Sequence, residues 1–147
     1  MLRLSKLTDY AVVVLVRLSE MEGCQTSPCL AGATGLPEPT VAKVLKALTS
    51  AGLVRSQRGA RGGYMLGSAL TQIAVADVVA AIDGPIALAA CVDGGSGDCL
   101  SEALCPVRGR WDPVNQVVMK ALSQMTLADM TATPLRPHPR AAALPAE

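Results

Sequence analysis

The chain has 147 residues, half of them apolar and 17% charged, with a formal net charge of +1. This length suits one domain, or one small domain with an appended helix, and the apolar half is sufficient for a core. Only three residues are aromatic, so the core must be aliphatic, and a mainly helical protein is expected.

The charge is unevenly distributed along the chain. Residues 1–70 hold eight Lys/Arg against four Asp/Glu, whereas residues 71–147 hold five against eight. The basic first half is a candidate for contact with a polyanion. No segment approaches the roughly 20 apolar residues that a membrane span needs, and no signal-peptide cleavage site follows the first apolar run. We therefore expect a cytoplasmic protein with no membrane partner, in which five cysteines favour a metal or redox site over disulfides.

Three helices are predicted in the first part of the chain. The first covers residues 5–20, with Ser5 as its N-cap, and is apolar over most of its circumference, which predicts burial on two sides. The second begins with Ser27 as N-cap and proline at the first helical position, and it is short because two glycines follow. The third covers about residues 39–50 after a tight turn, with apolar residues at helical spacing. Its core stripe consists of Val41, Val44, Leu45 and Leu48.

A hairpin with a basic tip is predicted directly after the third helix. Two short β segments, residues 53–57 and 64–66, flank a loop that contains three glycines and two arginines. The order helix, short helix, turn, helix and hairpin is typical of a winged helix-turn-helix. The predicted fold is therefore mainly α with a small β-hairpin wing.

The second half of the chain predicts two further helices around a loop. One covers about residues 73–82, and a long one begins with Asp112 as N-cap, followed by proline. The residues from Thr126 to Asp129 predict a capping box and a restart of the helix. The long helix is amphipathic, and its apolar stripe consists of Val114, Val117, Val118, Ala121, Leu122 and Met125.

These elements divide the chain into four predicted parts. The winged helix-turn-helix covers residues 1–84, a cysteine-bearing loop residues 85–110, and the long-helix region residues 111–132. Residues 133–147 are rich in Pro, Ala and Arg without a periodic pattern, so a disordered tail is predicted there.

Six residues are candidates for contact with double-stranded DNA. The leading end of the third helix would enter the major groove. The second lysine of that helix and the wing arginines can reach phosphates, or an arginine can enter the minor groove. Ordinary surface charge is the alternative for any single lysine, but the combination of a helix-turn-helix with a basic glycine-rich hairpin favours DNA binding. The six residues are Pro39, Thr40, Lys43, Lys46, Arg58 and Arg61.

Cys91, Cys99 and Cys105 lie in a segment rich in Gly and Asp, with the spacing C-x7-C-x5-C. This spacing is wider than the C-x2–4-C of a zinc knuckle, and it suits an iron–sulfur cluster, which takes Cys thiolates as ligands. A zinc site and small buried cysteines remain as alternatives. Cys24 and Cys29 lie beside the second helix and are expected to be ordinary small side chains.

Three thiols leave one ligand of a cluster to be found. The only histidine, His138, lies between prolines in the predicted tail, which makes it a poor candidate. Acidic residues remain, either Asp93, Asp98 or Glu102, or one from elsewhere in the fold.

Four stretches of the sequence together resemble the iron–sulfur winged-helix regulators of the IscR, NsrR and RirA group, and most closely those of the SUF system, which control genes for cluster assembly. The stretches cover residues 3–11 (RLSKLTDYA), the run from Gly35 to Val54, the wing at residues 58–66 (RGARGGYML) and the three-cysteine loop. The resemblance extends over about residues 1–130.

The resemblance implies a homodimer that binds palindromic DNA, with crossing C-terminal helices and a 4Fe–4S or 2Fe–2S cluster near the dimer interface. It also implies that the three loop cysteines are ligands. Some members use a histidine just after the third cysteine, but residues 106–108 are Pro-Val-Arg here. Members of the NsrR kind use an aspartate on the first helix of the partner subunit, and Asp9 stands in the matching Thr-Asp-Tyr context. The alternative role for Asp9 is a favourable interaction with the helix dipole or the acceptance of a cap hydrogen bond.

The expected function is therefore transcriptional regulation and not enzymatic catalysis. We expect a redox-sensing repressor that reports cluster, iron or redox status and controls SUF genes. Bound cluster would order residues 91–105 against the partner, and its loss would change the DNA affinity. The alternatives are a repressor responsive to nitric oxide or iron, a zinc or apo regulator without redox sensing, and a thiol redox protein, against which the lack of a Cys-x-x-Cys pair stands.

Overall fold

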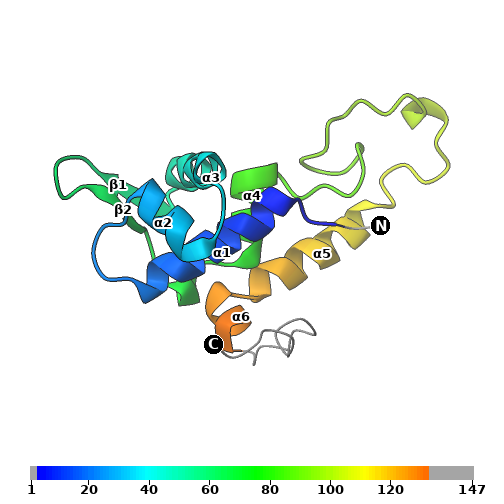
Figure 1. Ribbon diagram of the computed structural model, residues 1–147. Helices are drawn as coiled ribbons and strands as arrows, with labels where there is room; N and C mark the ends of the chain where they lie inside the picture. The colour runs from blue at the N-terminus through cyan, green and yellow to red at the C-terminus, as the bar shows by residue number, and fades with distance from the viewer. Residues whose placement is uncertain (1–2, 133–147) are drawn as a thin grey trace, which may run out of the picture.

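A computed structural model describes residues 3–132 of the chain (Figure 1). The predicted tail and His138 lie outside the described residues. Two short 3₁₀ turns occur at Leu70–Gln72 and Glu102–Leu104. The remaining elements are α1 Lys6–Glu20, α2 Ser27–Thr34, α3 Glu38–Ser50, β1 Val54–Gln57, β2 Gly63–Leu66, α4 Val75–Asp83, α5 Asp112–Gln124 and α6 Leu127–Ala132. The mainly helical fold with one antiparallel hairpin confirms the predicted winged helix-turn-helix.

The core lies where α1, α3 and α4 meet, and it is aliphatic as predicted. All four residues of the α3 stripe, from Val41 to Leu48, are 0% exposed. They pack with the buried face of α1, which includes Val14 and Leu15. Each such side chain contributes about 1.5–3 kcal/mol by leaving water. This packing fixes the orientation of α3, so its opposite face is held toward solvent.

Helix α1 begins as predicted, but only one of its two apolar faces is buried. The Ser5 hydroxyl accepts a hydrogen bond from the Thr8 amide at 3.1 Å, which satisfies one of the free N–H groups of the first turn. On the second face, Val12 and Val16 are half-buried and Val13 is 39% exposed. The prediction of burial on two sides is therefore wrong for the single chain.

Helix α2 begins one residue earlier than the sequence predicts. Its N-cap is Thr26, whose hydroxyl accepts the Cys29 amide at 3.3 Å, while the Thr26 carbonyl accepts the Leu30 amide at 3.0 Å. Those two amides are the ones that a cap at Ser27 would need, so the Ser27 hydroxyl has no partner in the described part of the chain. Gly35 ends the helix with φ of +70°, a conformation that glycine adopts without strain.

The hairpin is fastened to the segment before α2. The Gln25 amide donates to the Tyr64 carbonyl at 2.8 Å, and the Tyr64 amide donates back to the Gln25 carbonyl at 2.7 Å. Gly63 has φ of +153°, and a Cβ there would lie 2.6 Å from the Gln25 carbonyl oxygen, so this close approach needs glycine. The wing is thereby held against the body of the domain at its base, and its tip projects away (Figure 1).

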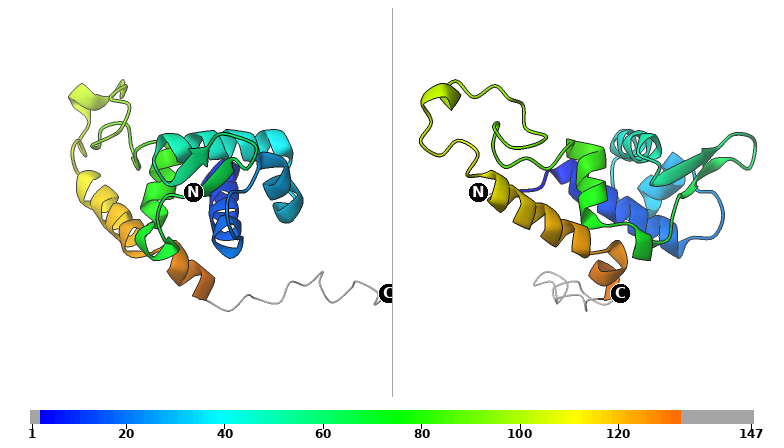
Figure 2. Two further views of the ribbon diagram at one scale, coloured as in Figure 1. Left: turned by 90° about the vertical axis from the view of Figure 1, so that its left-hand side faces the viewer. Right: turned by 180° about the vertical axis from the view of Figure 1, so that it is seen from behind.

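Helix α5 runs beneath the winged domain, where it packs against α4 (Figure 2). Its N-cap is Trp111 and not Asp112, which is the first helical residue. The helix ends at Gln124 because the next residues pair with another segment: the Leu127 amide donates to the Ile73 carbonyl at 2.9 Å. The predicted capping box then starts α6, with the Asp129 amide donating to the Thr126 hydroxyl at 3.1 Å. Within residues 3–132, no helix is long and apolar enough to cross a membrane.

Candidate DNA-binding surface and cysteine loop

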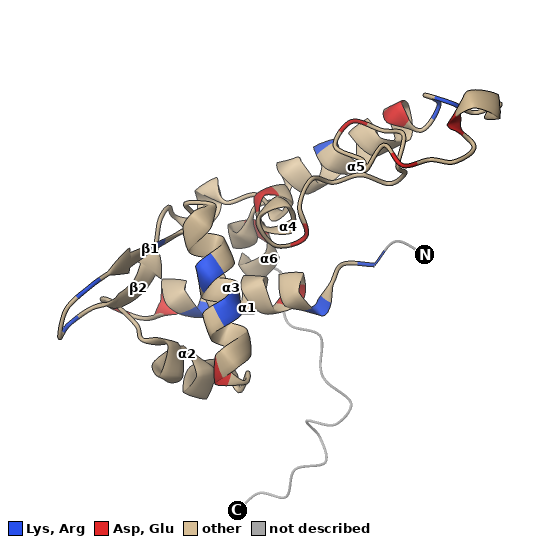
Figure 3. Cartoon of the chain, turned by 90° about the horizontal axis from the view of Figure 1, so that it is seen from above, with Lys and Arg blue, Asp and Glu red and all other residues tan. Residues whose placement is uncertain are grey.

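The outer face of α3 carries the four helix residues predicted to contact DNA. Pro39, Lys43 and Lys46 are exposed, and Thr40 is half-buried in the first turn. They lie opposite the buried stripe, so the same packing that fills the core presents them to solvent. Figure 3 shows the two lysines of α3 as the basic part of this helix. A helix that is fixed by its buried face and has a polar outer face can enter the major groove and contact base edges there.

The wing carries the other two predicted contacts at its tip. Arg58 and Arg61 are exposed, and both lie in the loop that joins β1 to β2. A third basic residue of the wing, Arg55, is exposed on β1 and was not among the predicted contacts. The alternation along β1 could have identified it, since Val54 beside it is buried and the next residue must face the other way.

Basic and acidic residues are partly separated on the molecule, although Arg108 and Arg110 lie in the loop and Glu38 lies on α3. Figure 3 shows Lys and Arg on α3 and the wing, whereas Asp and Glu gather on α4, on the start of α5 and along the loop between them. Such a separation favours approach of a polyanion to the α3 and wing end and disfavours it at the loop end. The loop is therefore placed away from the surface that would meet DNA.

The cysteine loop between α4 and α5 is built from local turns. Its backbone hydrogen bonds join its own residues, as when the Gly97 amide donates to the Ala90 carbonyl at 2.9 Å and the Cys105 amide to the Glu102 carbonyl at 3.4 Å. Val92 is its one buried side chain among residues 89–110. The loop extends beyond the helical body, as Figures 1 and 2 show. Its turns can rearrange without breaking an α-helix or a strand.

All three loop cysteines carry free thiols and are half-buried. Among residues 3–132, no three His, Cys, Asp or Glu side chains converge into a group that could hold a metal ion. The chemistry of the donor set nevertheless fits an iron–sulfur cluster, because three thiolates on one adaptable segment are suitable ligands. Gathering them requires a change of loop conformation that the local turns permit.

Asp9 lies on the first turn of α1 with an exposed side chain. It belongs to no group of ligating side chains within the described residues. It shares its helix face with Val13, which is also exposed. An exposed carboxylate beside an exposed valine is open to contact from a second chain.

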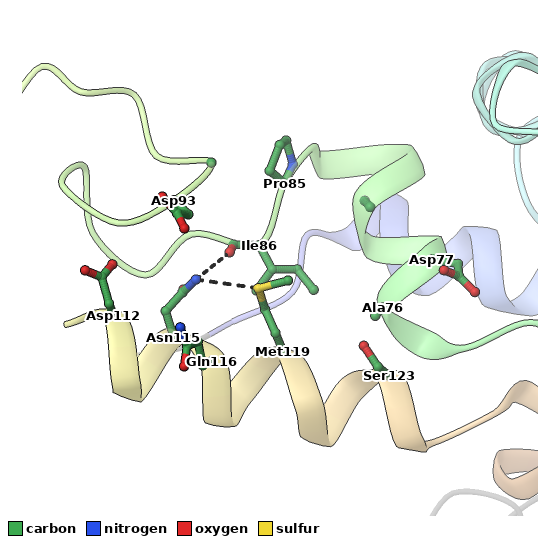
Figure 4. Close-up of a pocket in the computed structure, with 12 residues that line it drawn as sticks. Ala76, Asp77, Pro85, Ile86, Asp93, Asp112, Asn115, Gln116, Met119 and Ser123 are labelled. Carbon is green, nitrogen blue, oxygen red and sulfur yellow. Dashed lines mark hydrogen bonds between the residues drawn. The ribbon is translucent and has the colours of Figure 1, made fainter. Parts of the chain in front are cut away.

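The base of the loop is held by Asn115, which the sequence analysis did not single out. Asn115 lies on α5. Its side-chain nitrogen donates to the Ile86 carbonyl (Figure 4), and its side-chain oxygen accepts the Leu88 amide. It also lines a cavity of about 580 Å³ between α4, α5 and the loop. Three carboxylates, those of Asp77, Asp93 and Asp112, line the same cavity.

Cys24 and Cys29 lie in the DNA-binding half, far along the chain from the loop. The Cys24 thiol donates to the Gln57 side-chain oxygen at 3.5 Å, and the Cys29 thiol to the Gln25 side-chain oxygen at 3.3 Å. Cys24 is half-buried and Cys29 exposed. These contacts are those of ordinary small polar side chains.

The fold, with a basic recognition helix and wing, defines a winged helix-turn-helix DNA-binding protein. Comparison with known proteins identifies the family: the Rrf2 family, described as an iron-dependent transcriptional regulator, matches residues 4–133. The chain belongs to the Rrf2 family. It is thus a DNA-binding transcriptional regulator and not an enzyme, and the resemblance drawn from the sequence is confirmed at the level of the family.

Relatives and solved structures agree with this assignment. An HTH-type transcriptional regulator of Mycobacterium tuberculosis is 34% identical over 140 residues, covering 93% of this chain and 86% of the relative. The structure of CymR, the global cysteine regulator of B. subtilis, matches with a TM-score of 0.67 and 28% identity, covering 91% of this chain and 100% of that one. The structure of IscR from T. potens matches with a TM-score of 0.62 and 28% identity, covering 88% and 86%.

Proposed function

We propose that this Rrf2-family regulator works in the cytoplasm as a homodimer that binds a palindromic operator and senses iron–sulfur cluster or iron status through Cys91, Cys99 and Cys105. The observation that carries the proposal is the loop itself, with three free thiols on one segment of local turns attached to a DNA-binding domain. The iron-dependent description of the family and the similarity to IscR support it.

In this proposal the three thiolates hold a 4Fe–4S or 2Fe–2S cluster, and Asp9 of the partner subunit supplies the remaining ligand. The cluster, when bound, supplies a centre that oxygen, nitric oxide or loss of iron can change. An aspartate oxygen is a harder ligand than a thiolate, so its bond would be the labile one. The exposed position of Asp9 supports a contact that the single chain does not make.

The unpartnered face of α5 supports a dimer. Val117 is 68% exposed, and Val114, Ala121 and Met125 on the same stripe are exposed too. An amphipathic helix with an apolar face in water is stabilised by packing against another. A second copy of α5 would cover this stripe and fix the spacing of the two α3 helices, which must match about one turn of DNA.

At the operator, the outer face of α3 reads bases through Pro39, Thr40 and Lys43. Lys46, Arg58 and Arg61 neutralise phosphates. The regulated genes in this proposal are those of the SUF cluster-assembly system, an assignment that the sequence motifs support.

A second candidate function is regulation through the thiols without a cluster. It is favoured by the lack of any convergent group of three ligating side chains within the described residues and by the similarity to CymR, the global cysteine regulator of B. subtilis. In that case Cys91, Cys99 and Cys105 would respond to oxidation or zinc.

Anaerobic reconstitution with iron and sulfide, followed by absorption spectroscopy, tests the proposal. We expect sulfur-to-iron charge-transfer bands in the wild-type protein and in the matched control Cys24→Ala. We expect their loss in Cys99→Ala, and a shorter cluster lifetime in Asp9→Ala. Absence of the bands in the wild-type protein would favour the second candidate.

A further inference from the structure

The one buried residue of α5 is polar. Asn115 is 3% exposed, whereas Val114, Val117 and Met125 of the apolar stripe are exposed. A buried side-chain amide destabilises a fold unless its polar atoms have partners. The position is therefore explained by what Asn115 bonds to and not by burial of apolar area.

Asn115 holds one short stretch of backbone by two hydrogen bonds. Its Oδ1 accepts the Leu88 amide at 2.9 Å, and its Nδ2 donates to the Ile86 carbonyl at 3.1 Å. Nδ2 also lies 3.7 Å from the sulfur of Met119 (Figure 4). Because the two bonds fall on either side of residue 87, they fix both the distance and the direction of this stretch relative to α5.

Residues 86–88, which Asn115 holds by these two hydrogen bonds, lead directly into the cysteine loop. Leu88 precedes Cys91 by three residues, and Gly84, with φ of +88°, provides a turn on the other side. The covalent connection at the far end of the loop, residues 106–111, is exposed and made of turns. This connection can change its conformation at little cost. The hydrogen bonds of Asn115 with Ile86 and Leu88 cannot break without leaving buried polar groups unpaired.

We propose that Asn115 is the positioning residue that couples the conformation of the cysteine loop to α5. The inference rests on the proposed sensing function and names its route inside one chain. When the three thiols are brought together, residues 86–88 shift. The two hydrogen bonds of Asn115 transmit this shift to α5. The position of α5 in turn sets the spacing of the two α3 helices across the dimer.

Hydrogen exchange of the full-length protein, compared before and after anaerobic loading with iron and sulfide, tests this coupling. In the wild-type protein and in the neighbouring control Gln116→Ala, we expect loading to change the protection of both the loop and α5. In Asn115→Ala, we expect the Leu88 amide to exchange about tenfold faster and loading to change the loop alone.

A second measurement reads the consequence for DNA. We expect loading to change operator affinity by at least about fivefold in the wild-type protein and by less than about twofold in Asn115→Ala. An α5 that responds to loading as strongly in Asn115→Ala as in the wild-type protein overturns the proposal. The wild-type protein alone also tests the proposal: if loading leaves the hydrogen exchange of α5 unchanged in the wild-type protein, the proposal is overturned. Failure of the wild-type protein to take up a cluster, seen by absorption, overturns the proposed function and this inference with it.

Discussion

The Thr8 hydroxyl donates a hydrogen bond to the Asp83 carboxylate at 2.7 Å, which joins the first turn of α1 to the last residue of α4. Thr8 is 1% exposed, and it lies beside Asp9. Asp83 directly precedes the turn into the cysteine loop. The bond therefore fixes the start of α1, which carries the candidate ligand, to the point where the loop begins.

Replacing Thr8 by valine should test the strength of this bond. Valine keeps the shape and removes the donor, so we expect Thr8→Val to lower the free energy of unfolding by about 1–2 kcal/mol. Thr71→Val, at an exposed position, is the control, with an expected change within about 0.5 kcal/mol. Urea unfolding measures both, and equal stabilities for the two variants would show that the bond contributes nothing.

The capping box of α6 should give stability a dependence on acid pH. The side-chain hydrogen bond from Thr126, and then its backbone amide, hold the pKa of Asp129 below the ordinary 3.8. A lowered pKa in the folded state means that the stabilisation is present above the ordinary pKa and is lost as pH falls through the folded value. We expect Asp129→Asn to be less stable than the wild-type protein at neutral pH, with a difference that shrinks in acid. An NMR titration checks the cause: in Thr126→Val the Asp129 pKa should rise, and an unmoved pKa would assign the shift to another contact.

Removing a wing arginine should weaken DNA binding through phosphate contact. We expect Arg58→Ala to bind DNA more weakly whatever the sequence. For the dimer, we expect the slope of log affinity against log salt concentration to decrease in magnitude by about two, one for each wing. The cluster spectrum should be unchanged. Arg17→Ala is the control, because Arg17 already pairs with Glu20 at 2.8 Å. A salt slope for Arg58→Ala equal to that of the control would remove the wing tip from the interface.

A charge on the open face of α5 should prevent dimer formation. Val117 is exposed in the single chain, so Val117→Asp should leave the monomer folded. In a dimer it would bury an unpaired carboxylate on each side, and we expect dissociation to be favoured by on the order of 100-fold or more. Gln116→Asp, turned by about 100° around the helix, is the control. Sedimentation equilibrium measures both variants, and an intact Val117→Asp dimer would place the interface elsewhere.

Much of the fold follows from periodicity that the sequence shows directly. The stripe from Val41 to Leu48 is predicted and found in the core, since apolar residues at helical spacing form one face that packs away from water. The cap of α2 differs by one residue because Thr26 and Ser27 can both accept, and only the path of the preceding chain decides between them.

The base of the loop could not be predicted in the same way. Asn115 reads as a polar surface residue of an amphipathic helix, and its role depends on backbone groups more than 25 residues away. The open second face of α1 and the open stripe of α5 share one cause. The apolar pattern of each helix predicts that the face is buried, but it does not say whether the same chain or a second chain covers it.

Native mass spectrometry of the anaerobically purified protein tests whether the dimer holds a cluster on its loop cysteines, since it reports the mass of the assembly and of any bound cluster together. We expect a dimer with one iron–sulfur cluster per chain, and we expect Cys99→Ala to lose the cluster while it remains a dimer. A wild-type dimer at the mass of the bare polypeptides, or one that carries zinc alone, would contradict this expectation.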